Sequence, residues 1–469
     1  MNINPYIFRA YDIRGIAEGP EADLTPQTVE AIGKATGTYL IRKSNVKEMA
    51  IGRDNRTHSE KLHLAFINGI ISTGIRAIDI GISTTPLMYY AVSKFGYESG
   101  ATITASHNPK QDNGIKLVHA HAHCLAGEEL QEILKIIEKQ DYMVAAKKGL
   151  IVKNTDVFQT FKDEVKSKTS LSRPLKVVVD TGNGVAGLYA PAMLQELGCE
   201  VIELFTELDG NFPNHEANPE QPANMIDLGR KAVESQADLG IGFDGDGDRL
   251  GVVDEKGSFH SIESPLIIMS RQMLSEYPGE KVIFDVKVSQ KIIEDIEKNG
   301  GQPIMERTGH SFIEERVHQE NAPLAFEKSG HVYCNKKFYD YFGFDDALFA
   351  ACKLVETLSK TNISFSEQLS DVRKLISTPE AKAKCPDHLK FEIIEKIRDK
   401  FCTDRECITI DGARIKFDSD SWALIRASNT SPAFTLLFEA PSKERLDEIR
   451  SLVFTELSKY PEVILPEIK

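Results

Sequence analysis

An apolar strand that ends in an aspartate occurs three times along this chain, each time followed by a loop and a helical pattern. The strands are MAIGRD, KVVVD and VIFD, and their aspartates are Asp54, Asp180 and Asp285. A glycine follows each helical pattern, 20, 18 or 15 residues beyond the aspartate, and a second strand comes next. Such a crossover makes adjacent parallel strands, whose buried faces need helices on both sides. The repeat therefore predicts three related α/β/α sandwich domains with mixed sheets.

The pattern changes beyond about residue 372. KFEIIEKIRDKF predicts a helix, and the ITIDGARIKF segment after it contains Asp411-Gly412, a strong hairpin signal. SWALIRAS and AFTLLFEA predict further antiparallel strands, and Ser442 can cap a final helix. A smaller α+β domain is expected here. A length of 469 residues fits three or four domains at roughly 150 residues each. The predicted domains are 1–150, 151–254, 255–371 and 372–469.

The bulk composition excludes several classes of function. The formal net charge of −14, with no Lys/Arg-rich run, opposes binding to nucleic acid. The N-terminus has no signal-peptide pattern, and no apolar stretch approaches the roughly 20 residues of a membrane span. We expect a cytoplasmic protein without nucleic-acid or membrane partners.

Cysteine and histidine usage points to no dedicated metal or redox motif. The seven cysteines are scattered and lack any Cys-x-x-Cys spacing, so reduced and mostly buried thiols are expected. His119, His121 and His123 alternate, and on a strand they would share one face that could bind a transition metal. A solvent-facing strand is the favoured interpretation.

Ser106 follows the apolar run ATITA and precedes His107-Asn108-Pro109, a sequence typical of turns. Such a turn can lift the serine away from the end of a strand, so we expect an exposed side chain. A phosphorylated serine is a phosphoryl donor that needs no activating base. Taken alone, the motif is more typical of a solvated turn.

DGDGDR places Asp244, Asp246 and Asp248 at alternate positions behind the apolar strand LGIGF, with glycines that let the backbone wrap an ion. An all-oxygen set favours magnesium or calcium. An EF-hand is excluded because its sixth position, which requires glycine, holds Arg249, and because both flanks look like strands. Arg249 can balance the aspartates or, with a metal bound, reach a phosphate.

Further along the chain, polar motifs could bind a sugar phosphate. RASNTSP, from Arg426 to Pro432, can enclose a phosphate dianion, although a polar hairpin loop is the alternative. FEKSGH, from Phe326 to His331, offers groups that hydrogen-bond sugar hydroxyls. TGHSF and DVKVS add His310 and Lys287.

These motifs, in this order, resemble the α-D-phosphohexomutase superfamily, and most closely its bacterial phosphomannomutase/phosphoglucomutase branch. The resemblance covers essentially the whole chain through FRAYDIRG, TASHNP, NGIK, DGDGDR, TGHS, EKSGH, GFDD and RASNTSP. It implies four domains around a central cleft. Three positions depart from the wording common in the family: Phe326 where glycine is frequent, Glu314 where lysine is, and Lys328 where methionine or glutamine is.

The resemblance also implies roles for individual residues. Ser106 resembles the phosphoserine, and Asp244, Asp246 and Asp248 resemble ligands of one Mg²⁺ ion that a phosphoserine oxygen completes. The implied catalytic residues are Ser106, Lys116, Arg14, His107 and Arg249, with Lys116 the leading candidate for proton transfer. The implied substrate-binding residues are Tyr11, Lys287, His310, Glu327, Ser329, His331, Arg426, Ser428, Asn429 and Thr430.

The reaction implied is the interconversion of hexose 1-phosphate and hexose 6-phosphate through a bound hexose 1,6-bisphosphate, which also serves as activator. RASNTSP favours mannose or glucose as the sugar, and glucosamine ranks second. An alternative of another class is a regulator that binds sugar phosphates without turnover. The expected partners are small-molecule sugar phosphates, and the expected state is a monomer or a homodimer.

Overall fold

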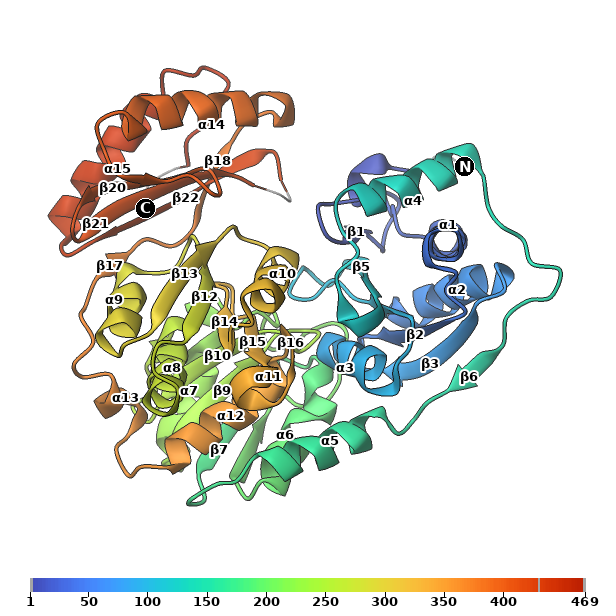
Figure 1. Cartoon of the computed structure of the whole chain (residues 1–469), viewed down its shortest axis with the longest axis horizontal. Coiled ribbons are helices and arrows are strands. Elements are labelled where there is room, and N and C mark those ends of the chain that lie inside the picture. Colours follow the sequence, from blue (N-terminus) through green and yellow to red (C-terminus); the bar gives the residue numbers. More distant parts are fainter. Residues whose placement is uncertain (1–2, 429–430, 467–469) are drawn as a thin grey trace.

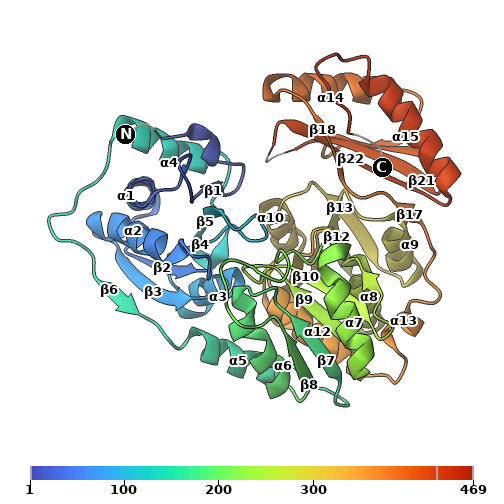
Figure 2. The same ribbon diagram turned by 180° about the vertical axis from the view of Figure 1, so that it is seen from behind.

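Figure 1 shows the computed structural model of the chain, which describes residues 3–428 and 431–466. Three α/β bodies follow one another along the sequence, and a fourth body, drawn in red, packs on the third. In the view from behind, the fourth body turns its sheet toward the third and keeps helices α14 and α15 on its outer side (Figure 2). The predicted fold class, three α/β/α units and a C-terminal α+β unit, is confirmed.

The first sheet is mixed and has the strand order β1-β5-β4-β2-β3-β6. Its strands are β1 (Ile13–Ile16), β2 (Glu48–Arg53), β3 (Arg76–Ile82), β4 (Ser99–Ile103), β5 (Asp112–His119) and β6 (Ile151–Lys153). Strand β2 runs parallel to β3 and β4, whereas β5 runs antiparallel to β4 and β1. Helices α1 (Pro26–Ser44), α2 (Ser59–Ser72) and α4 (Glu128–Lys139) cover one face, and α3 (Thr85–Phe95) covers the other (Figure 1).

The second and third sheets repeat the parallel pair that the sequence predicts. The second, ordered β11-β10-β9-β7-β8, contains β7 (Lys176–Asp180), β8 (Glu200–Leu204), β9 (Leu239–Phe243), β10 (Leu250–Asp254) and β11 (Phe259–His260). The third, ordered β13-β12-β14-β15-β16, contains β12 (Lys281–Asp285), β13 (Gln302–Glu306), β14 (Leu324–Phe326), β15 (Val332–Asn335) and β16 (Phe342–Asp345). Strands β7 and β8 are parallel, as are β12 and β13.

Helices cover these two sheets and join them to their neighbours. Those of the second unit are α5 (Val157–Lys168), α6 (Ala190–Glu196) and α7 (Ile226–Ser235), with the short turns η3 (Val185–Leu188) and η4 (Pro222–Met225). Those of the third are α8 (Glu263–Glu276), α9 (Gln290–Lys298), α10 (His310–Glu320), α11 (Lys336–Tyr339), α12 (Ala347–Ser359) and α13 (Phe365–Gln368). One apolar core runs from α3 through both sheets to α12, so these units share a single buried interior.

The C-terminal unit has an antiparallel sheet, β17-β22-β21-β20-β19, in which β18 also pairs with β22. Its elements are β17 (Ile376–Ser377), β18 (Ala381–Lys384), α14 (Asp387–Cys402), β19 (Cys407–Ile408), β20 (Ala413–Asp418), β21 (Ser421–Ala427), β22 (Ala433–Ala440) and α15 (Lys443–Leu457). Gly412, at φ 77°, closes the predicted hairpin between β19 and β20. Ser442 caps α15 by accepting the backbone N–H of Arg445.

The face of this sheet that is not covered by α14 and α15 packs against the third unit. Trp422 packs with Val286, Leu424 and Leu437. The Arg414 guanidinium lies 3.8 Å from the Trp422 ring and donates hydrogen bonds of 2.7 Å to two backbone carbonyls of the third unit. These contacts hold the sheet of the C-terminal unit against the third unit.

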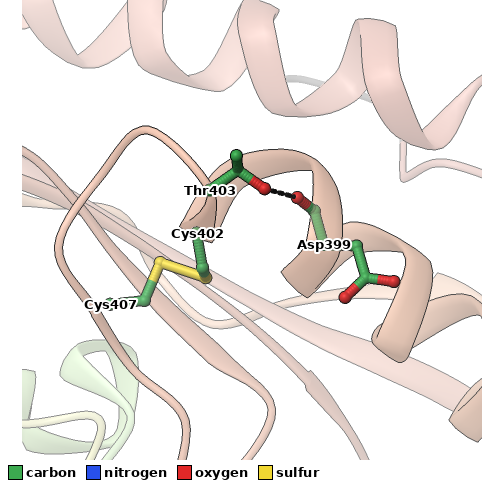
Figure 3. Close-up of a disulfide and its surroundings, with 4 residues drawn as sticks. All are labelled: Asp399, Cys402, Thr403 and Cys407. Carbon is green, nitrogen blue, oxygen red and sulfur yellow. Dashed lines mark hydrogen bonds between the residues drawn. A yellow bond between two sulfur atoms is a disulfide. The ribbon is translucent and has the colours of Figure 1, made fainter.

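Two sequence predictions about local structure and cysteine pairing are wrong. The three alternating histidines do not share a strand, because β5 ends at His119 and the chain turns through η2 (Ala120–Ala122), where His121 has a left-handed φ of 62°. The cysteines are not all reduced, because Cys402 and Cys407 form a disulfide at the end of α14 (Figure 3). Four of the five free cysteines are buried, as expected. Of the helices in the described segments, none is long and apolar enough to span a membrane.

The disulfide closes a short loop, so its removal should cost less stability than the loss of a disulfide that closes a long loop. We expect the Cys402→Ser/Cys407→Ser variant to lose about 2 kcal/mol of stability, the loop-closure entropy for so short a separation. Urea denaturation of the C-terminal transition, with and without a phosphine reductant, measures this. The reductant should lower the wild-type midpoint and leave the double variant unchanged, and a reductant effect of equal size in both would contradict the assignment.

Candidate active site

The serine loop leaves the end of β4 and turns at Ser106, whose φ of 53° is left-handed. Thr104 Oγ1 accepts the Ser106 backbone N–H at 2.9 Å, and Arg56 donates to the Ser106 carbonyl at 2.7 Å. The predicted exposure is wrong, because Ser106 is only 1% exposed. The DGDGDR loop of the second unit covers it, so closely that a Cβ on Gly245 would lie 2.5 Å from the Ser106 carbonyl oxygen.

The DGDGDR loop connects β9 to β10, the two predicted flanking strands, and the structure pairs them antiparallel. Asp244, Asp246 and Asp248 are fully buried. Asp244 Oδ1 accepts the backbone N–H groups of Asp248 and Arg249 at 3.0 and 3.1 Å, and its Oδ2 accepts the Ser106 hydroxyl at 2.6 Å. The loop therefore brings three carboxylates to the serine from a different unit of the chain.

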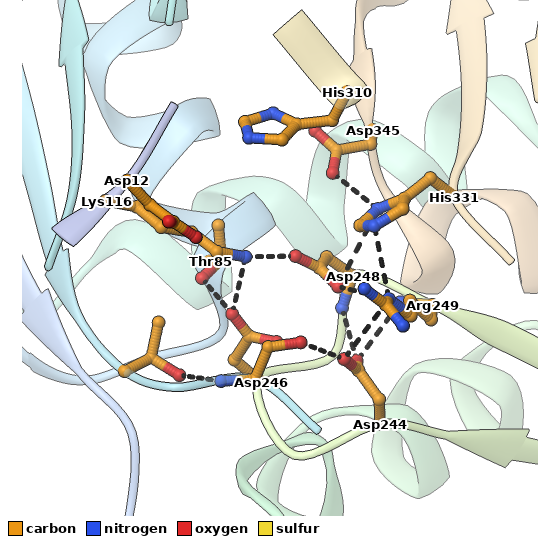
Figure 4. A network of polar contacts seen from close by, with 12 residues as sticks. Asp12, Thr85, Lys116, Asp244, Asp246, Asp248, Arg249, His310, His331 and Asp345 are labelled. Atoms are coloured by element: carbon orange, nitrogen blue, oxygen red, sulfur yellow. Dashed lines mark hydrogen bonds and ion pairs between the residues drawn. The ribbon is translucent and has the colours of Figure 1, made fainter. Parts of the chain in front are cut away.

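Lys116, on β5, joins the two loops (Figure 4). Its Nζ donates to Asp246 Oδ2 at 2.8 Å and also contacts Asp248 Oδ2. Although burial disfavours its charge, Asp246 and Asp248 raise the pKa of Lys116 above its ordinary value, so the side chain stays an ammonium ion. Thr85 at the start of α3 adds a hydrogen bond of 2.6 Å to Asp246 Oδ2.

The three aspartates fit a divalent cation. Asp246 Oδ1 and Asp248 Oδ1 are buried and make no hydrogen bond within the described residues, and the three carboxylates supply oxygen atoms within 4.8 Å of one another. Burial, and then repulsion from Asp248 and Asp246, raise the pKa of Asp244 well above its ordinary value. A bound cation would relieve both effects, and hard oxygen ligands suit magnesium or calcium.

Arg249 and His331 border this cluster. Arg249 Nε donates to His331 Nε2 at 3.2 Å, so the neutral imidazole carries its proton on Nδ1, which faces Asp345 Oδ2 at 2.8 Å. Burial lowers the pKa of His331, which favours this neutral form. The GFDD motif contains Asp345, but the sequence predicted no role for this residue. Its position directly after an apolar strand, the pattern used for Asp54, was the available signal.

A cavity of about 720 Å³ lies beside the cluster and is lined by all four parts of the chain. The predicted site residues in its wall are Tyr11, Arg14, His107, Lys116, Arg249, Lys287, His310, Glu327, Ser329, His331, Arg426 and Ser428. Ser106 and the three aspartates lie buried directly behind the wall residues His107, Lys116 and Arg249. Asn429 and Thr430 fall outside the described residues.

The cavity wall carries positively charged side chains, and Arg426 keeps a donor that no described acceptor binds. Arg426 donates to Asp411 Oδ2 at 2.7 Å through Nε, and its buried Nη2 makes no hydrogen bond within the described part of the chain. Lys287 lies 3.7 Å from Asp285 and 3.5 Å from Glu380. Lys382 also lines the cavity and was missed, because AKAK in β18 shows no motif. The site can accept a polyanion.

The sugar-motif residues are fixed in position. Glu327 accepts the Gly309 backbone N–H at 2.9 Å and the Tyr333 hydroxyl at 3.2 Å. Two of the departing residues face elsewhere: Phe326 is fully buried beside Phe284, and Lys328 donates to Glu263 at 2.7 Å. Among the described residues of the cavity wall, neither appears, and Glu314 does not either.

Comparison with known proteins decides the family. The sequence families of the phosphoglucomutase/phosphomannomutase alpha/beta/alpha domains I, II and III match residues 5–143, 156–257 and 263–375. The family of the C-terminal domain matches residues 380–456. The chain belongs to the phosphoglucomutase/phosphomannomutase family, within the α-D-phosphohexomutase superfamily. It is thus a phosphohexomutase family enzyme of the isomerase class.

Individual relatives are similar over nearly their whole length. The phosphomannomutase/phosphoglucomutase of Pseudomonas putida is 39% identical over 98% of this chain and 97% of its own. The phosphoglucomutase of Neisseria gonorrhoeae is 38% identical over 98% of both. The crystal structure of a phosphoglucomutase/phosphomannomutase family protein from Burkholderia thailandensis superposes with a TM-score of 0.90 at 34% identity, over 99% of this chain and 100% of that one.

Proposed function

We propose that this enzyme interconverts hexose 1-phosphates and hexose 6-phosphates, of mannose or glucose, through a phosphorylated Ser106. The observation that carries the proposal is the hydroxyl of Ser106, 2.6 Å from a buried aspartate of the triad and adjacent to a cavity lined with cations. A hydroxyl between a cation cage and a polyanion site suits phosphoryl transfer. The name of the Pseudomonas putida relative includes both activities and supports mannose and glucose, whereas the Neisseria gonorrhoeae relative, a phosphoglucomutase, supports glucose.

In the proposed reaction, the phosphoryl group leaves Ser106 Oγ and bonds to O1 or O6 of the bound sugar phosphate, whose hydroxyl loses its proton. His107 can accept this proton, since burial lowers its pKa and keeps the imidazole neutral, and its Nδ1 lies 3.2 Å from Ser106 Oγ. Lys116, held as an ammonium ion, can return a proton to the serine oxygen. The bisphosphate then turns around, and its other phosphate returns to Ser106.

The remaining residues orient the substrate. Arg426, with Ser428 on the same loop, would hold the phosphate that does not react, while Glu327 and Ser329 would bind sugar hydroxyls. Arg14, held by Asn108 at 2.9 Å, and Arg249 would contact the reacting phosphate. Asp244, Asp246 and Asp248 would hold Mg²⁺ together with an oxygen of the serine group, and the ion neutralises phosphoryl charge when bound.

The test follows 6-phosphate formation by the phosphorylated protein with Mg²⁺ and trace hexose 1,6-bisphosphate. Mannose, glucose and glucosamine 1-phosphates are offered separately. Turnover of the first two supports the proposal. Turnover of glucosamine 1-phosphate alone identifies the phosphoglucosamine mutase alternative, and binding of all three without turnover identifies the regulator.

Arg426→Ala should raise KM about 10- to 100-fold for both sugars, because it removes a charge-assisted contact worth about 1.5–3 kcal/mol. The kcat value should fall less than KM rises, since the lost contact serves the phosphate that does not react. Steady-state kinetics with both 1-phosphates measure the two parameters. Arg405→Ala, an exposed arginine of the same unit, is the control. An unchanged KM would exclude Arg426 as a phosphate ligand.

A further inference from the structure

Three side chains from two units of the chain meet beside α10. His123 follows η2 in the first unit, whereas Glu314 and His318 lie four residues apart on α10 of the third and therefore share one face of the helix. One ligand atom from each lies within 4.8 Å of the other two. The His123 and His318 rings meet edge to face, with centroids 5.2 Å apart. None of the three lines the cavity among its described residues.

Glu314 is the unusual member of this cluster. It is only 4% exposed, and its buried Oε1 makes no hydrogen bond within the described residues. His123 Nδ1 lies 3.3 Å from Oε1 as an ion-pair contact without good hydrogen-bond direction. Burial raises the pKa of Glu314 to about 7, although His123 opposes the shift. A buried carboxylate oxygen is thus turned toward two histidines without full compensation of its charge.

The histidines are suited to act as ligands. Burial, followed by the proximity of His123 and His121, lowers the pKa of His318 and favours the neutral imidazole, whereas the contact with Glu314 raises the pKa of His123, so a metal ion that binds there displaces a proton. His123 and His318 are both exposed, so their rings can rotate. Tetrahedral zinc ligands at about 2.0–2.2 Å from the ion lie about 3.5 Å from one another, so the cluster needs to contract by only about 1 Å.

We propose that His123, Glu314 and His318 form a binding site for zinc or a closely similar transition-metal ion, with water as the fourth ligand. Two imidazoles and one carboxylate suit zinc, whereas Mg²⁺ and Ca²⁺ prefer oxygen ligands alone. The site is separate from the aspartate triad in both position and chemistry. It does not depend on the reaction proposed above.

A metal at this site would connect the first unit to the third. His123 is anchored by the sheet of the first unit through β5, and α10 begins at His310, which lines the cavity. In Figures 1 and 2, α10 lies at the side of the third unit that faces the first. Zinc bound to both units should therefore raise the temperature at which they unfold, because it binds only the folded arrangement.

The test measures Zn²⁺ binding by equilibrium dialysis with Mg²⁺ in excess, so that the triad is saturated by the ion it prefers. The wild-type protein should bind one more equivalent of zinc than the His123→Ala/His318→Ala variant, and only the wild type should gain thermal stability from that equivalent. His388→Ala removes another exposed histidine and should bind as the wild type does.

Equal zinc stoichiometry in the wild type and the double variant would overturn the proposal, as would a wild type that binds no zinc. Because His123 also contacts Glu314, the single variant His318→Gln provides a second measurement on an exposed residue of α10. Loss of the same equivalent in His318→Gln, with an unchanged circular dichroism spectrum, supports the site. Retention of that equivalent overturns it.

Discussion

Ser106→Ala should abolish mutase turnover, lowering kcat by about 10⁴-fold or more, because it removes the hydroxyl proposed to carry the phosphoryl group. The substitution replaces the side-chain hydroxyl with hydrogen and leaves the backbone unchanged. The Ser106 carbonyl therefore still accepts the hydrogen bond from Arg56. We therefore expect an unfolding midpoint close to that of the wild type. Initial rates with added hexose 1,6-bisphosphate, and mass spectrometry of the intact protein, measure the two effects.

A matched control separates chemistry from packing. Ser270→Ala removes another buried serine, whose hydroxyl bonds, among the described residues, only to the Ile267 carbonyl within its own helix. This variant should retain turnover and the phosphoryl mass. If Ser106→Ala kept wild-type rates, or still acquired a phosphate, the assignment of Ser106 as the phosphoryl carrier would be wrong.

Local patterns were sufficient to predict the elements. The strand, helix and strand units around Asp54, Asp180 and Asp285 recur because continuous apolar runs, caps and glycines act over a few residues. Gly198 shows this: at φ 98° it ends a helix in a conformation that favours glycine. The antiparallel C-terminal sheet was readable for the same reason, from Asp411-Gly412 and the cap at Ser442.

Contacts between units were not readable. Ser106 was expected to be exposed because nothing in TASHNP indicates that a loop 138 residues away covers it. The pairing of His331 with Asp345, and the meeting of His123 with α10, likewise depend on how whole units pack. The disulfide was missed because a spacing of five residues is common by chance and only the hairpin after α14 brings the two sulfurs together.

Asp244→Asn should lower turnover, yet it should raise the stability of the metal-free protein. The amide can keep the two backbone N–H donors of Asp248 and Arg249 on its oxygen and donate to Ser106, so the loop retains its hydrogen bonds. One metal ligand is lost, however, and we expect turnover to fall at least about 100-fold and the stabilisation by Mg²⁺ to disappear. Rates and thermal unfolding across a Mg²⁺ titration measure both.

The stability difference between the variant and the wild type should favour the variant when no metal is bound. The folded pKa of Asp244 is raised, so its ionisation disfavours the fold once pH exceeds the ordinary carboxyl pKa, and the penalty grows until pH passes the folded value. Asparagine does not ionise. With EDTA present, the variant should therefore be more stable than the wild type by on the order of 1–3 kcal/mol near neutral pH, and the difference should shrink toward pH 4.

Urea denaturation at several pH values measures that difference. Asp254→Asn is the control, a buried aspartate at the end of β10 whose carboxylate contacts His260; it should lose stability without changing the response to Mg²⁺. An Asp244→Asn protein that is less stable than the wild type at every pH would show that Arg249 and Lys116 already compensate the triad. The metal would then not be needed to relieve repulsion among the three carboxylates, and the argument that the triad is built for a cation would fail.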